Sequence, residues 1–124
     1  MTLRELYAMI DGDYDRAMNV LRIEKLMDKH IRKFPASEMF SELARAGETM
    51  DAEGLFESAH AMKGVCGNLG LVKLAELASE ICEEFRPGSE RKLTDDEVRG
   101  KLDEIAASHQ KAMDGVRRYE QELQ

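Results

Sequence analysis

The chain has 124 residues, 43% of them apolar, with 18 Lys and Arg against 25 Asp and Glu and a formal net charge of −7. A chain of this length can bury roughly two-thirds of its unfolded surface, so it can form a single domain over residues 1–124 without disulfides or a metal. The acidic balance disfavours a nucleic-acid partner, because neutralising phosphates requires a basic face, and the longest uncharged run, residues 64–72, is far shorter than the ~20 apolar residues of a membrane span.

The composition favours helix throughout. There are 2 Pro, 9 Gly and 8 Met and no Trp, and β-branched residues are sparse. In the first fifty residues, a short helix is predicted to end at residues 11–13, where Asp13 can cap a second helix that runs toward Phe34. Pro35 breaks this second helix, and Ser37 can cap a third, closed by the next glycine.

Three longer helices follow. One begins near Asp51 and continues to Gly70, and the next ends at Pro87-Gly88. The last begins with Thr94 and Glu97, which have the spacing of a capping box. Its apolar side recurs at spacings of three and four, which is typical of a bundle seam, at Val98, Leu102, Ile105, His109, Ala112, Val116, Tyr119 and Leu123.

Short turns between helices that each carry one apolar stripe predict an all-α fold, an up-and-down four-helix bundle with a short extra N-terminal helix. His109 lies on the apolar stripe of the last helix and is interpreted as a packed boundary residue, and His30 has no set of partner residues.

Two patterns that suggest metal binding are interpreted otherwise. Aspartates within residues 11–15 imitate the start of a calcium loop, but arginines occupy the positions where that loop needs Gly and Glu, so we expect a turn and a cap. Cys66 and Cys82 occupy apolar helical positions without ligand spacing, so we expect buried, reduced thiols. No metal or other cofactor is expected in this chain.

The helix from Asp51 to Leu69 separates into two faces at about 100° per residue. On the face directed away from the core, His60 is followed at i+3, i+4 and i+7 by Lys63, Gly64 and Gly67. The core face is predicted to consist of Leu55, Ala59, Met62, Cys66 and Leu69.

The exposed face carries the chemistry. Glycine inside a helix costs roughly 1 kcal/mol relative to Ala, so two glycines beside His60 indicate that another molecule approaches closely there. A neutral imidazole is a competent nucleophile toward an acyl phosphate, and the Lys63 ammonium favours the neutral ring and stabilises bound phosphate. Phe56 beside His60 is either part of an apolar docking rim or tucked against the helix boundary.

The segments His60-Ala61-Met62-Lys63-Gly64 and Val65-Cys66-Gly67-Asn68-Leu69-Gly70 closely resemble the H-x-[LM]-K-G signature of histidine-containing phosphotransfer (Hpt) domains. The pattern extends over roughly residues 12–86, and the last helix matches only as an amphipathic helix.

The resemblance implies that His60 accepts phosphate from an aspartyl phosphate on a receiver domain and passes it to another receiver. Lys63 would balance the phosphate charge, and Gly64 and Gly67 would give the partner clearance. Family members commonly place Gln on the following helix near the phosphate. This chain has Ser79, Cys82 and Arg86 on that stripe instead, and of these we select Arg86.

The implied partners are response-regulator receiver domains, a hybrid histidine kinase, or both. The receiver would supply Mg²⁺, so this chain would be a relay substrate without kinase activity of its own, and no nucleotide-binding loop is present. We expect a cytoplasmic monomer, because no secretory signal is evident, and Met1 with the capped helices favours a free-standing protein over an excised domain.

Two alternatives remain open. A noncatalytic module could bind receivers without being phosphorylated, although His60, Lys63 and Gly64 are all present. The chain could also be the phosphoacceptor helix pair of a sensor kinase, in which an acidic residue typically follows the acceptor histidine; here Ala61 follows it.

Overall fold

The computed structural model describes residues 1–123, which are all-helical with no strand. Its elements are α1 (Leu3–Met9), α2 (Tyr14–Leu21), α3 (Glu24–Lys33), the 3₁₀ turn η1 (Phe34–Ala36), α4 (Glu38–Glu48), α5 (Ala52–Asn68), α6 (Val72–Glu84) and α7 (Asp95–Glu122).

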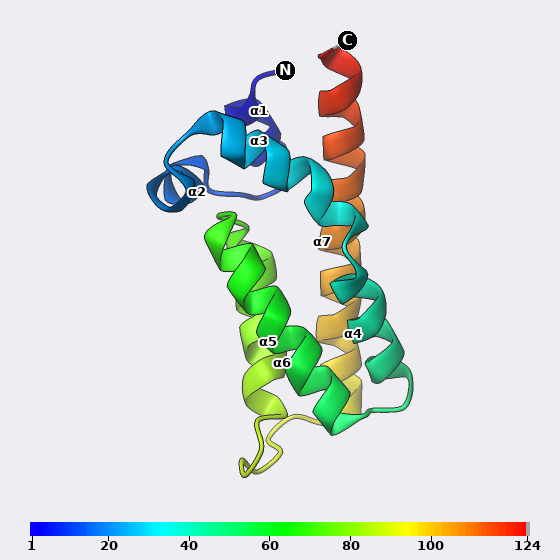
Figure 1. The fold of residues 1–124 in the computed structure, drawn as a ribbon. Coiled ribbons are helices and arrows are strands. Elements are labelled where there is room, and N and C mark those ends of the chain that lie inside the picture. Colours follow the sequence, from blue (N-terminus) through cyan, green and yellow to red (C-terminus); the bar gives the residue numbers. More distant parts are fainter. Residues whose placement is uncertain (124) are drawn as a thin grey trace.

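Helices α4 to α7 run alternately up and down and form the predicted four-helix bundle (Figure 1). Helix α7 extends along the whole bundle, and α1, α2 and α3 gather at the end where α5 finishes. Both ends of the described chain lie there, and the amino group of Met1 is 3.6 Å from a carboxylate oxygen of Glu122. Among the described residues, no helix combines the length and apolar character that a membrane crossing needs.

The predicted helix starts are confirmed by side-chain caps. The backbone N–H of Arg16 donates to Asp13 Oδ1 at 3.0 Å at the start of α2, so this acidic stretch is a turn and a cap. The hydroxyl of Ser37 caps α4. At the start of α7, Thr94 and Glu97 form both hydrogen bonds of the capping box, at 3.0 and 3.1 Å.

The predicted second helix is wrong in one respect, because it is two helices. Arg22 adopts φ 74°, a left-handed conformation that ends α2, and α3 begins at Glu24. Neither Gly nor Pro marks this turn. The spacing of the buried residues does not mark it either, because Met27 and Ile31 lie ten and fourteen residues after Ala17, within one stripe of a continuous helix. The N-terminal addition is therefore three short helices.

The seam of α7 is largely as predicted. Val98, Ile105 and Val116 are buried, and half-buried His109 lies at the boundary. Leu123 was expected on the seam but is 50% exposed, because α7 extends beyond the helices that cover it.

Glu84, at the end of α6, anchors the connection to α7. Its residue surface is only 6% exposed, and its carboxylate accepts hydrogen bonds from Arg91 Nε at 2.6 Å and from the backbone N–H groups of Lys92 and Leu93. Burial alone would raise the pKa of Glu84, but these hydrogen bonds outweigh it and lower the pKa. The ionised carboxylate therefore stabilises the folded state.

We predict that Glu84→Ala lowers the free energy of unfolding by roughly 2 kcal/mol, because two backbone amides and a guanidinium lose their buried acceptor. The control Glu90→Ala, at an exposed loop position, should stay within about 0.5 kcal/mol of wild type. Since the folded pKa is lowered, the contribution of Glu84 is present above the ordinary carboxyl range and is lost as the pH falls through the folded value. In denaturant titrations, the free energies of unfolding of wild type and Glu84→Ala should therefore approach each other as the pH falls from about 6 to about 3. A difference between them that does not change with pH would contradict this account.

Candidate functional site

Helix α5 presents two opposite faces, as its sequence predicts. The five residues predicted for the core face are all buried: Leu55, Ala59, Met62, Cys66 and Leu69. His60 is exposed on the other side of the same helix. The apolar face fixes the rotation of α5 about its axis, so the direction of His60 follows from the packing of its neighbours.

The surface around His60 is open along α5. A Cβ atom built on Gly64 or on Gly67 would have no neighbour within 4 Å. Lys63, one turn from His60, is half-buried. Nothing in the fold of this chain requires glycine at these two positions, so their small size leaves space for something outside the chain.

Two side chains contact the His60 ring. Phe56, one turn earlier on α5, stacks on it with 5.8 Å between ring centroids and 24° between ring planes. From α6, the sulfur of Cys82 lies 3.9 Å from His60 Nδ1, and Cys82 is fully buried. Phe56 is thus half-buried beside the histidine, a position that fits either a docking rim or packing at the helix boundary.

Arg86, selected from the sequence as the residue nearest the phosphate, is engaged elsewhere. Its guanidinium donates to both carboxylate oxygens of Glu83, at 2.6 and 3.2 Å, and lies 5.6 Å from the centre of the Phe56 ring. The hydrogen bond from Arg86 lowers the pKa of Glu83, and the charge of Lys63 adds to this effect. Arg86 therefore reaches the histidine only through Phe56.

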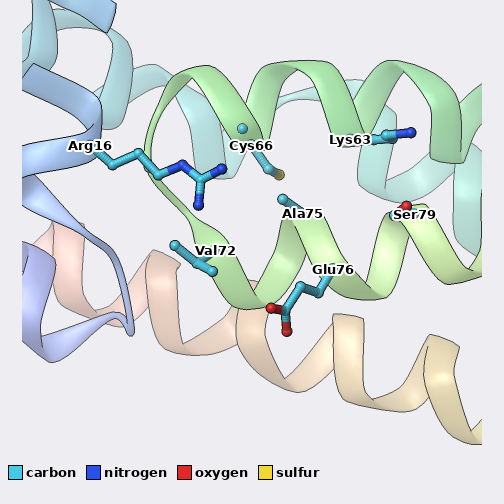
Figure 2. A pocket seen from close by; sticks show the side chains of 9 residues that line it. Arg16, Lys63, Cys66, Val72, Ala75, Glu76 and Ser79 are labelled. Carbon is cyan, nitrogen blue, oxygen red and sulfur yellow. The ribbon is translucent and has the colours of Figure 1, made fainter. Parts of the chain in front are cut away.

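A groove of about 320 Å³ lies between α5 and α6 beside Lys63. Figure 2 shows the side chain of Arg16 reaching from α2 into one end of this groove, while Lys63 and Ser79 lie at the other end. Gly67 also lines it. Two cations from different helices thus border the same groove, and the carboxylate of Glu76 also lines it.

The position of Arg16 in the groove and the contact of Cys82 with His60 are two features of the site that the sequence did not predict. Arg16 reaches the groove because the N-terminal helices pack on the end of α5, which no local pattern indicates. Cys82 is one of the three residues on the α6 stripe that faces the phosphate site, and its spacing of three from Ser79 indicates that it points toward α5. The sequence prediction assigned its thiol only a packing role.

The remaining histidines and the other cysteine lie where the sequence predicts. His109 donates from Nε2 to the carbonyl oxygen of Pro35 at 2.6 Å and stacks on Phe40, so it is a satisfied boundary residue. His30 is exposed on α3. Burial raises the pKa of the Cys66 thiol to about 12, which keeps it protonated and unreactive near neutral pH.

Comparison with known families gives one match. The model of the family described as Hpt domain matches residues 35–117, about two-thirds of the chain. This span includes α4 to α6 and most of α7, so it begins later and ends later than the similarity noted in the sequence, and it leaves out α1 to α3. No curated protein and no solved structure is similar enough to match the chain.

Proposed function

Because the chain belongs to the Hpt domain family, whose members have a phosphotransfer role in two-component signalling, we propose that His60 is the residue that carries the phosphoryl group. The observation that carries this proposal is the open face of α5, where an exposed histidine lies beside two glycines with no neighbouring atoms. A surface built only for stability would have side chains there, because alanine is favoured over glycine in a helix.

The proposed reaction is a direct displacement at phosphorus. A lone pair on an imidazole nitrogen of His60 attacks the phosphorus of an aspartyl phosphate on a receiver domain. The bond between phosphorus and the aspartate oxygen breaks, and its electron pair returns to the carboxylate. Attack on the phosphohistidine by the aspartate of a second receiver reverses the step and passes the group onward.

Lys63 and the glycines make different contributions. The Lys63 ammonium, one turn away, offsets the negative charge that accumulates on the phosphoryl oxygens. Gly64 and Gly67 keep the backbone of α5 bare, so the receiver surface can bring its aspartate into line with the ring. The receiver supplies Mg²⁺ and most of the catalysis, and this chain supplies a positioned nucleophile.

Hpt domains interact with receiver domains and histidine kinases. We propose that this chain acts as a monomer in the cytoplasm, exchanging phosphate with receivers and without kinase activity of its own. The alternative, a module that binds receivers without being phosphorylated, is separated from this proposal by one measurement: transfer of acid-labile label from phosphorylated receiver domains.

We predict that His60→Gln abolishes acid-labile labelling, because glutamine has the size and polarity of histidine but no nitrogen that can hold the phosphoryl group. The matched control is His30→Gln, a change at another exposed histidine, which should label at the wild-type rate. Both variants should bind unphosphorylated receiver equally well in a titration. Label remaining on His60→Gln would assign the phosphate to another residue, and receiver binding by an unlabelled wild-type protein would favour the noncatalytic module.

Lys63→Ala should still accept phosphate, but roughly ten- to a hundredfold more slowly, because one cation near the developing charge is lost while the receiver's metal remains. Lys73→Ala, at an exposed lysine on α6, is the control and should transfer normally. Single-turnover transfer rates measure the difference. Equal rates for the two variants would remove Lys63 from the mechanism.

Gly64→Leu should separate stability from transfer. Leucine is a better helix former than glycine by roughly 0.8 kcal/mol and meets open space here, so the melting temperature should stay the same or rise. Transfer should fall at least about tenfold, because the new side chain occupies the space that the receiver needs. Gly100→Leu, at an equally open glycine on α7, should leave transfer unchanged; a wild-type rate for Gly64→Leu would overturn the clearance role.

A further inference from the structure

The contact between Cys82 and His60 joins a fully buried side chain to an exposed one. The sulfur lies 3.9 Å from Nδ1, on a residue with no exposed surface, while the ring itself belongs to an exposed residue. The Nδ1 edge of the ring is therefore directed toward α6. Nε2, on the opposite edge of the ring, is directed away from it.

The ring is restrained on a second side. Phe56 stacks on it at 5.8 Å, and Arg86 lies over the Phe56 ring, held there by Glu83. Rotation of the imidazole would break the aromatic contact and move Nδ1 away from the thiol. The orientation of His60 is thus set by contacts from both α5 and α6.

We propose that Cys82 is a positioning residue: its sulfur accepts a hydrogen bond from Nδ1–H of His60 and so keeps the lone pair of the neutral ring on Nε2. The effect of this hydrogen bond on phosphoryl transfer rests on the proposed function, but the location of the proton on the ring does not. Sulfur is a weak acceptor, so the effect is a bias between two tautomers that differ little in energy.

The bias matters because only one tautomer can react at the exposed nitrogen. With the proton on Nδ1, Nε2 attacks phosphorus, the bond from phosphorus to the aspartate oxygen breaks, and the electron pair leaves on the carboxylate. The Nδ1 proton stays where it is, so the ring becomes a cation that still donates to Cys82. With the proton on Nε2, that nitrogen has no lone pair to offer.

A thiol suits this position for an electrostatic reason. A carboxylate at the same place would also accept from Nδ1–H, but its charge would oppose the approach of a phosphoryl group. A neutral thiol orients the ring without that repulsion. The other two residues on the stripe are placed differently, since Ser79 lines the groove beside Lys63 and Arg86 is paired with Glu83.

The first test needs no partner protein. In the wild-type chain labelled with nitrogen-15 histidine, at a pH where His60 is neutral, we expect the spectrum of an Nδ1–H tautomer, with assignment from the signal lost in His60→Gln. Cys82→Ala should shift the population toward Nε2–H. Cys82→Ser, whose hydroxyl also accepts a hydrogen bond, should keep the proton on Nδ1. A wild-type ring protonated mainly on Nε2 would overturn the proposal, even if Cys82→Ala failed to fold.

The second test measures the reactivity of Nε2 with phosphoramidate as the phosphoryl donor. Cys82→Ala should be phosphorylated roughly three- to tenfold more slowly than wild type, as expected for loss of one weak hydrogen bond, and Cys82→Ser should recover most of the rate. The matched control is Cys66→Ala, which removes the other buried thiol and should change neither rate nor spectrum. An equal effect of both alanine substitutions would reduce Cys82 to a packing role.

Failure of every receiver to label His60, with the Nδ1–H spectrum intact, would instead refute the proposed function and leave the positioning contact standing.

Discussion

The packing of α5 against α6 is the interaction on which the rest of this structure depends. The two helices are antiparallel and are joined by the short turn at residues 69–71, so they share a long apolar seam. Leu55, Met62 and Ile81 have no exposed surface, and full burial of such a side chain contributes about 1.5–3 kcal/mol. Because a helix is rigid, burying this face of α5 directs His60 outward and places Cys82 behind its ring.

The same seam explains how α5 tolerates a face that is poor for helix stability. Most helical stability in proteins comes from tertiary burial of an apolar face, not from intrinsic propensity. The inner face of α5 is buried along its length, so the glycines at 64 and 67 can be accommodated on the outer face at a cost of about 1 kcal/mol each. Stability and access are thus assigned to opposite sides of one helix.

The sequence predicts those features that follow from local periodicity. These features are the two faces of α5, the capping box of α7 and the boundary position of His109. Each can be predicted because it depends on residues three or four apart. The break at Arg22 was not predicted, because an arginine in a left-handed conformation carries no local signal and the buried residues on either side keep the spacing of one continuous helix. Arg86 was selected over Cys82 from the same stripe, but the pairing of Arg86 with Glu83 depends on side-chain geometry that spacing does not encode.

The N-terminal helices lie outside the family match, but one of them, α2, contributes a side chain to the candidate site. The backbone N–H of Asp13 donates to the carbonyl of Gly70 at 2.7 Å, which ties the start of α2 to the turn between α5 and α6. Gly70 has φ 72°, and a Cβ there would clash with the carbonyl oxygen of Asp13, so this close approach requires glycine. The tie holds α2 where Arg16 enters the groove beside Lys63. A chain with a net charge of −7 therefore places two cations, together with Glu76, around one groove of the candidate site, and such a local arrangement of charge governs the approach and choice of a charged partner more than net charge does.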